Sequence, residues 1–153
     1  MELRVPFGEF LWELNEPLST AHHMVGDESI PGVYDNISKL KLPRFRNGDR
    51  VACLYRDRKV VLSEPITGGR TLWNAAEAIE RGLQRPINNQ DRTLRSEIYA
   101  CIANFLRSPD RLRLVQMYEA GTLRGIDLLG DYTGFCGSMH REKGGMWVYG
   151  LNS

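Results

Sequence analysis

Residues 50–83, RVACLYRDRKVVLSEPITGGRTLWNAAEAIERGL, decide the fold, because the spacing of their apolar residues changes within this stretch. Residues 50–55 and 60–62 are rich in β-branched and aromatic side chains, and four polar residues separate them, which predicts a β-hairpin. From Thr71 onward the apolar residues recur every three or four positions, which predicts a helix with Thr71 as its N-cap. A strand pair therefore leads directly into a helix.

The segments after this stretch are mainly helical. Gly82 and Pro86 are expected to end the first helix, and similar spacing predicts a second helix from about residue 91 to 106. A third helix is expected from Ser108 to Gly121, and a shorter one over residues 123–129. The segment from Gly134 is glycine-rich, and Met146, Trp147, Val148 and Tyr149 form a predicted last strand.

The segments before the hairpin give weaker signals. Residues 9–14 fit either a short strand or one helical turn, and residues 15–43 predict a long surface loop with a short helix near Thr20–Val25. The fold class is therefore α+β, in which a β-hairpin precedes three or four helices and a late C-terminal strand. We expect one compact domain over residues 1–153, with an acidic, loop-rich arm at 1–43 and an α+β core at 44–153.

Composition limits the classes of protein to be considered. No run approaches the roughly 18 apolar residues that a membrane span needs, and residues 1–14 lack the basic start of a signal peptide. Cys53, Cys101 and Cys136 are odd in number and widely spaced, without a Cys-x-x-Cys pair. We therefore expect a cytoplasmic protein with reduced cysteines, without a membrane partner, a metal or a cofactor.

Charge is divided along the chain although its net value is only +1. Residues 1–36 hold seven acidic residues and one basic residue, whereas residues 37–62 hold eight basic and two acidic residues. This division predicts an anion-facing surface on the hairpin, unless the acidic arm packs on the hairpin within the same molecule. Arginine outnumbers lysine sixteen to four, and its planar guanidinium suits phosphate and base edges. The predicted nucleic-acid-binding residues are Arg44, Arg46, Arg50, Arg56, Arg58 and Lys59.

A second candidate site joins the hairpin to the helix. Two glycines allow a ligand to approach the backbone, and the N–H groups at a helix start can hold a phosphate. Trp73 follows the turn directly, where it could stack on a base or pack against the hairpin. The predicted phosphate-binding residues are Thr67, Gly68, Gly69, Arg70, Thr71 and Trp73.

The same turn has a likeness to a known family. Residues 59–72, KVVLSEPITGGRTL, resemble the phosphoribosyl-pyrophosphate loop of phosphoribosyltransferases, which implies a transferase acting at residues 67–71. The likeness covers about a dozen of the 153 residues. It departs from the family pattern, because Glu64 alone stands where the family has an acidic pair and Arg70 interrupts the Thr-Gly-Gly-Thr order. We therefore keep the transferase as an alternative without assigning the chain to the family.

Three further patterns are short and open to structural interpretations. Gly134–Ser138 resembles the nucleophile turn of chymotrypsin-like viral cysteine proteases, which implies Cys136 as a nucleophile with a base from His22 or His23. The predicted helices disagree with the two β-barrels of that fold. Residues 114–129 could form a helix-turn-helix, but helix pairs with a glycine turn are common. The histidines and Cys136 have no second metal-binding pair to support a zinc site.

These observations give three hypotheses about function. The first is a non-enzymatic binding or regulatory protein that engages a phosphorylated anionic ligand, with nucleic acid first and a nucleotide second. The second is a protein-directed inhibitor or adaptor that uses the acidic arm on a host protein. The third is an enzyme, either a phosphoribosyl-type transferase or a Cys136 hydrolase.

Overall fold

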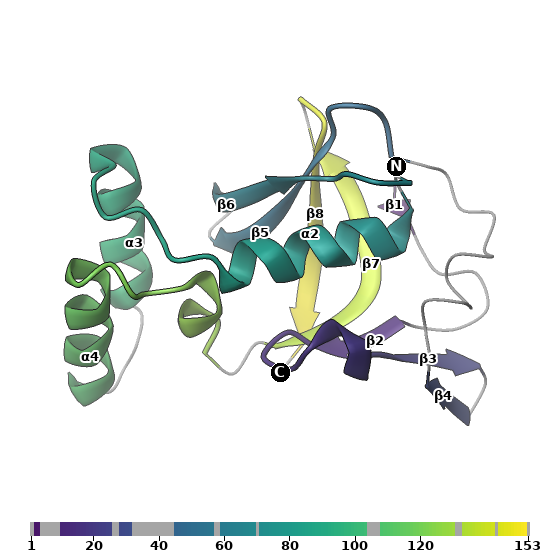
Figure 1. Ribbon diagram of the computed structural model, residues 1–153, viewed down its shortest axis with the longest axis horizontal. Coiled ribbons are helices and arrows are strands. Elements are labelled where there is room, and N and C mark those ends of the chain that lie inside the picture. Colours follow the sequence, from purple (N-terminus) through teal and green to yellow (C-terminus); the bar gives the residue numbers. More distant parts are fainter. Residues whose placement is uncertain are drawn as a thin grey trace.

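The structure, a computed structural model, describes residues 2–3, 10–25, 28–31, 45–56, 59–69, 71–103, 108–130, 133–142 and 144–152, and these ranges contain both helices and strands (Figure 1). The described strands are β1 Glu2–Leu3, β2 Phe10–Glu13, β3 His22–Val25, β4 Glu28–Pro31, β5 Arg50–Arg56, β6 Lys59–Pro65, β7 Gly134–Glu142 and β8 Met146–Asn152. The described helices are α2 Leu72–Gln84, α3 Arg92–Ala103 and α4 Ser108–Glu119, with 3-10 turns η1 Leu18–Thr20 and η2 Gly125–Leu128.

The strands join in the order β4-β3-β2-β7-β8-β5-β6, and β1 pairs with β7 beside this path. Neighbouring strands are antiparallel except β5 and β8, which run parallel with Val51 opposite Trp147. The hairpin β5–β6 therefore lies at one side of the sheet, with β6 as the edge strand among the described residues.

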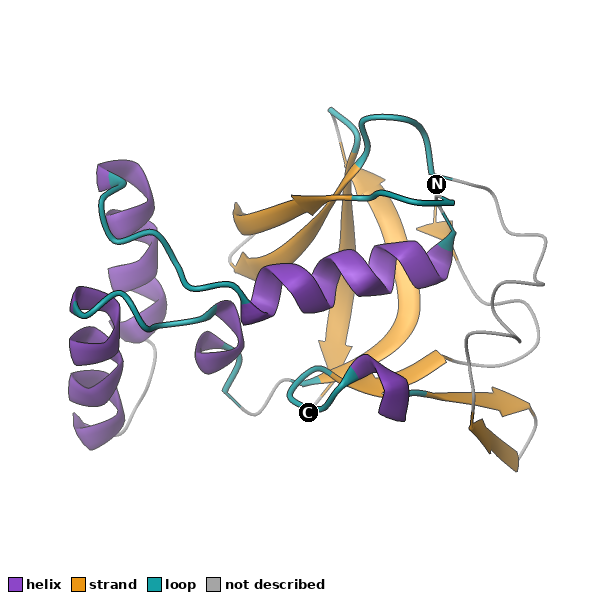
Figure 2. Cartoon of the chain, in the orientation of Figure 1, coloured by secondary structure: helices purple, strands orange, loops and turns teal. Residues whose placement is uncertain are grey.

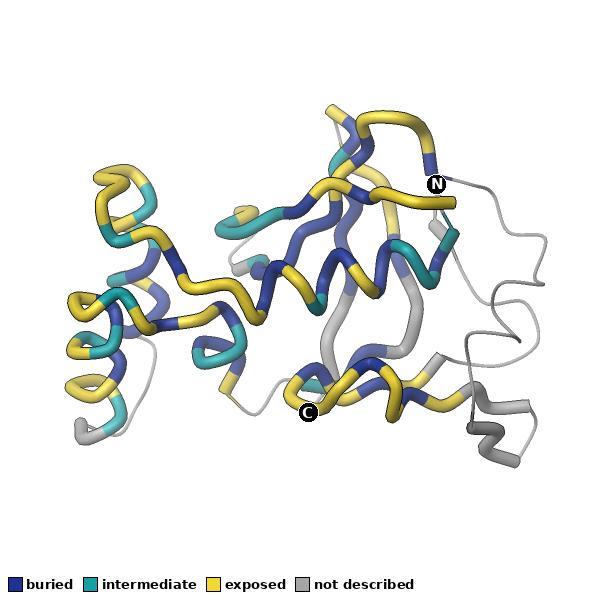
Figure 3. Tube along the Cα trace, in the orientation of Figure 1, coloured by how far each residue is buried: buried dark blue, intermediate teal, exposed yellow. Residues whose placement is uncertain are grey.

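Helix α2 covers one face of the sheet and forms the core with it (Figures 1 and 3). Its apolar stripe, which includes Leu72, Ile79 and Leu83, is almost fully buried. Beneath it, Phe135 meets Trp12 with ring centroids 5.9 Å apart and Tyr149 at 5.0 Å, both edge to face. These residues come from three different strands, so the aromatic contacts hold the middle of the sheet together.

Helices α3 and α4 pack against each other beyond the C-terminal end of α2 (Figure 2). Ile98, Cys101 and Ile102 of α3 are buried, as are Leu114 and Tyr118 of α4. Outside this seam the pair presents mainly polar side chains to solvent, and Leu112 is 60% exposed. No helix in the described part of the chain is long and apolar enough to cross a membrane.

The structure confirms the hairpin, the Thr71-capped helix, the two helices that follow and the strand at residues 146–149. The predicted order is nevertheless incomplete, because strands also precede the hairpin. The helix expected near Thr20–Val25 is wrong: residues 22–25 form β3, which pairs with both β2 and β4. The glycine-rich segment from Gly134 is strand β7, since it has β1, β2 and β8 as partners. Gly82 lies inside α2, which continues to Gln84.

Candidate functional site

The glycine turn of residues 67–69 is exposed at the N-terminal end of α2. Thr71 caps the helix by a reciprocal box: Asn74 N–H donates to Thr71 Oγ1 at 3.4 Å, and Thr71 N–H donates to Asn74 Oδ1 at 3.0 Å. These two backbone donors are thus occupied within the helix. Gly68 has a φ of +81°, a conformation that favours glycine, so the turn depends on its sequence. Arg70 lies outside the described residues, and Trp73 is half-buried against the core.

Two further turns meet the glycine turn at the same end of the sheet. Ile66 N–H donates to Asp49 O at 3.0 Å, which joins residues 45–49 to the end of β6. Arg50 N–H donates to Gly145 O at 3.0 Å, which joins the start of β5 to the β7–β8 turn. We call this region, residues 45–50, 66–69 and 144–145, the three-turn end.

Asp49 holds the three-turn end together, a role that no local sequence pattern indicates. Its carboxylate is 3% exposed and accepts hydrogen bonds at 2.9 Å from both the Arg46 N–H and Trp147 Nε1. Arg141 Nη2 lies 3.5 Å from Asp49 Oδ1. Burial raises the pKa of Asp49, but these hydrogen bonds and the charge of Arg141 outweigh it, so the pKa lies below its ordinary value. The carboxylate stays ionised and already has its partners.

Arginine side chains surround this buried carboxylate. Arg46 and Arg50 are exposed, and the guanidinium of Arg50 donates to Ser63 Oγ and to Ser63 O, each at 3.1 Å. Ser63 points away from α2, because the neighbouring Glu64 faces α2. Arg141 is opposite Trp147, Trp147 is opposite Val51, and Val51 is opposite Glu64, so the partly exposed Arg141 side chain lies on the face that Glu64 shares with α2. The guanidinium groups of Arg50 and Arg141 therefore lie on different faces of the sheet.

The predicted basic ribbon does not form one surface around this end. Lys59 lies at the opposite end of the hairpin, about 20 Å from Arg50 along the seven-residue strands, and its Nζ is 3.6 Å from Glu97 Oε1 of α3. Arg44 and Arg58 lie outside the described residues, as does the side chain of Arg56. Among the described members, Arg46 and Arg50 adjoin the glycine turn and Lys59 does not.

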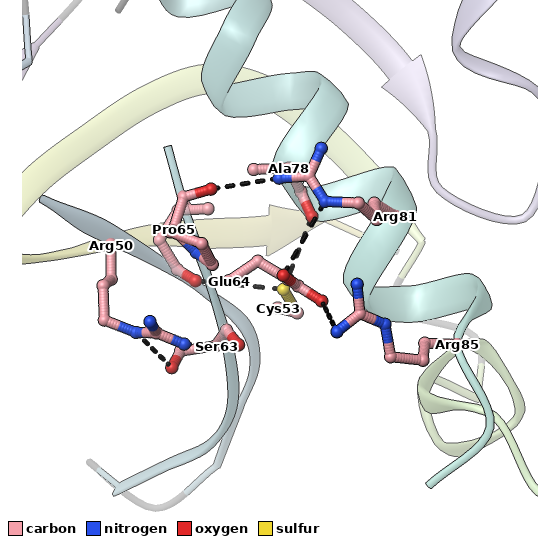
Figure 4. A network of polar contacts seen from close by, with 9 residues as sticks. Arg50, Cys53, Ser63, Glu64, Pro65, Ala78, Arg81 and Arg85 are labelled. Carbon is pink, nitrogen blue, oxygen red and sulfur yellow. Dashed lines mark hydrogen bonds and ion pairs between the residues drawn. The ribbon is translucent and has the colours of Figure 1, made fainter. Parts of the chain in front are cut away.

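Glu64, the acidic residue before the glycine turn, pairs with arginines at the C-terminal end of α2 (Figure 4). Its carboxylate is 5% exposed, with Arg85 Nη1 at 3.0 Å and Arg81 Nε at 3.7 Å. Arg81 is nine residues after the first residue of α2, so this ion pair lies about 13 Å along the helix axis from the glycine turn. The Glu64 carboxylate therefore does not lie beside the glycine turn. The resemblance to the transferase loop had implied that the two would form one site.

Cys53 is buried in the core and packs between the sheet and α2. It lies on β5 with its side chain against α2, where Gly82 leaves room for it: a Cβ on Gly82 would lie 2.3 Å from Cys53 Sγ. Burial, followed by the charge of Glu64, raises the pKa of this thiol to about 12. A thiol with such a pKa stays protonated near neutral pH and is a poor nucleophile.

The residues of the proposed cysteine hydrolase and zinc site lie on two strands that are not neighbours. Cys136 and His140 are in β7, His22 and His23 are in β3, and β2 lies between these strands in the sheet. The side chains of Cys136 and His23 are not among those that the structure describes. His140 Nε2 lies 3.1 Å from Glu142 Oε1. Among the side chains that the structure describes, no group of three or more His, Cys, Asp or Glu residues could hold a metal ion.

The described part of the acidic arm lies apart from the hairpin in the sheet order. Strand β2 pairs with β7, so β7 and β8 separate the arm from β5. The arm also reaches α2, where Leu18 N–H donates to Glu80 Oε2 at 2.6 Å. Trp12, Leu14 and Leu18 are buried in the core. The described part of the arm thus contacts β7, α2 and the core, and Arg46 and Arg50 remain exposed.

Comparisons of this chain with protein-family models, curated proteins and solved structures gave no match.

Proposed function

We propose that this chain is a small cytoplasmic binding protein that contacts a phosphorylated polyanion, nucleic acid before nucleotide, through its three-turn end. One observation carries the proposal. Arg46 and Arg50 face solvent, whereas Asp49 between them is buried and already bonded to the backbone, Trp147 and Arg141. The local carboxylate therefore does not cover the arginines, which can contact phosphate oxygens.

The arrangement of the cations favours an extended ligand over a small one. Arg50 and Arg141 lie on different faces of the sheet. The exposed carboxylate of Glu142 is two strands away from Arg50 and pairs with His140. A nucleotide needs donors that converge on one phosphate group. A nucleic-acid strand carries a phosphate on every residue and can contact cations spread around a rim. The exposed glycine turn adds a place where a backbone can approach closely.

Charge reversal at the two ends of the hairpin tests the proposal. Arg46→Glu keeps the backbone N–H that donates to Asp49. Lys59→Glu makes the same charge reversal at the opposite end of the hairpin. We expect Arg46→Glu to weaken binding of a single-stranded oligonucleotide about tenfold and to reduce the salt slope between about 50 and 200 mM. Lys59→Glu should leave the affinity within about twofold, because the exposed residue lies far from the site. Fluorescence anisotropy measures both.

Equal affinities for the wild type and Arg46→Glu would contradict the proposal. An equal loss in both variants would show only a general charge effect, which also contradicts a defined site. Thermal unfolding of both variants checks that the fold is unchanged.

A further inference from the structure

The edge of β6 has a pattern of hydrogen bonds that the anion-binding proposal does not use. Asp49 O accepts from Ile66 N–H, and Arg50 N–H points to Gly145 on the β8 side. In an antiparallel pair the backbone groups of successive residues alternate in direction. The N–H and C=O groups of Glu64 therefore point toward β5, and the carbonyl groups of Ser63 and Pro65 point toward the outer edge of β6, which has no partner strand there among the described residues.

Each of these two outward carbonyls accepts from an arginine side chain (Figure 4). Arg50 Nη2 donates to Ser63 O at 3.1 Å, and Arg81 Nη2 donates to Pro65 O at 3.0 Å. Arg50 reaches the edge from the face away from α2, whereas Arg81 reaches it from α2 itself. Pro65 has no N–H to offer a neighbouring strand. Two guanidinium groups thus cover these two acceptors at the C-terminal end of β6.

The chemistry of these contacts determines which strand could replace them. A guanidinium binds a carboxylate more strongly than a neutral carbonyl, because both partners are then charged. An incoming strand with carboxylates on its side chains could draw the two guanidinium groups off the edge. Ser63 O and Pro65 O would then be free to accept backbone N–H groups from that strand. A second copy of β6 has the opposite effect, because it brings Arg50 and Arg81 close to their own copies.

We propose that β6 is a docking edge for an extended acidic peptide of a partner protein, and that Arg50 and Arg81 act as its gate. The peptide adds to β6 as an edge strand and places carboxylates against the two guanidinium groups, one on each face of the sheet. Charge complementarity selects the partner: Arg50 and Arg81 are exposed and cationic, whereas Glu64, the carboxylate between them along β6, is buried and paired. This surface uses Arg81 of α2, which is not part of the three-turn end.

Binding of two designed peptides to the full chain tests this proposal. A fluorescein-labelled peptide of four Glu-Val repeats should bind in an anisotropy titration, and the matching Lys-Val peptide should not. Arg81→Gln should weaken Glu-Val binding about tenfold, since one charge-assisted contact is lost. Arg85→Gln is the matched control: it also removes a partner of Glu64 but leaves the Pro65 carbonyl covered, so peptide binding should stay within about twofold.

Two results would overturn the docking edge: no binding of the Glu-Val peptide to the wild type, or binding that Arg81→Gln leaves unchanged. If the peptide does not bind and Arg81→Gln self-associates in sedimentation, the arginines only block the edge. Arg46→Glu separates this proposal from the previous one, because it should weaken oligonucleotide binding about tenfold and keep Glu-Val binding.

Discussion

The two ends of α2 are held in different ways. At the N-terminal end, Thr71 and Asn74 satisfy each other within one helical turn, beside an exposed glycine turn. At the C-terminal end, the buried Glu64 of β6 lies between Arg81 and Arg85, and Gly82 packs against Cys53. Both ends bury apolar residues, but polar contacts at the C-terminal end join the helix to the sheet, whereas the polar contacts between Thr71 and Asn74 stay within the helix. Changes in the turn should therefore alter the surface more than the stability.

The largest effect is expected where α2 approaches β5 most closely. In Gly82→Val the new Cβ would lie 2.3 Å from Cys53 Sγ and 2.7 Å from Glu64 Cγ, so the helix must move away from the sheet. We expect a loss of about 3 kcal/mol in the free energy of unfolding, measured by urea denaturation. Gly69→Ala at the other end is the control, with an expected change within about 0.5 kcal/mol. Similar losses in both variants would remove the difference between the ends.

A smaller effect is expected from the ion pairs at the same end. Glu64→Gln keeps the shape of the side chain but removes the charge that Arg81 and Arg85 contact. Since both arginines are partly exposed and can turn to water, we expect a loss of about 1.5 kcal/mol rather than the full value for a buried pair. A double-mutant cycle with Arg85→Gln measures the coupling. Additive losses would mean that Glu64 and Arg85 do not stabilise each other.

The smallest effect is expected at the N-cap. Thr71→Ala removes the hydroxyl that accepts from Asn74 N–H, and helix N-caps of this kind contribute about 1 kcal/mol. Thr71→Ser keeps the hydroxyl and should stay close to the wild type. If Thr71→Ala destabilised the chain more than Glu64→Gln, the N-terminal end would be the stronger attachment, contrary to our expectation. Urea denaturation measures both variants under the conditions used for Glu64→Gln.

Local signals explain which parts of the fold the sequence could predict. The hairpin and the Thr71 cap depend on residues close together in the chain, and both are confirmed. Strand β7 was missed because its glycines and polar residues form a strand only through distant partners. The same applies to β3, which needs β2 and β4 on its two sides.

The candidate site also combines features that local sequence indicates with features that depend on distant contacts. The exposed glycine turn was visible in the sequence, because glycines between a strand and a capped helix are a local signal. The pairing of Asp49 with Trp147 joins positions 98 residues apart, and no local pattern marks it. The contacts of Glu64 with Arg81 and Arg85 depend on how α2 crosses β6. Sequence therefore indicated the basic residues, but the sheet determines which of them adjoin the turn.

The position of β7 and β8 has a consequence for the order of assembly during synthesis. These strands are the last described elements to leave the ribosome, yet they lie between β2 and β5 in the sheet. Until they arrive, α2 can pack on the hairpin β5–β6, but nothing joins this unit to β2, β3 and β4 in one sheet. Val51 must wait for Trp147 to form the parallel β5–β8 pairing, and such distant contacts form slowly. Apolar surface on the earlier strands therefore stays exposed until β7 and β8 leave the ribosome, and these two strands then join the two parts of the described sheet.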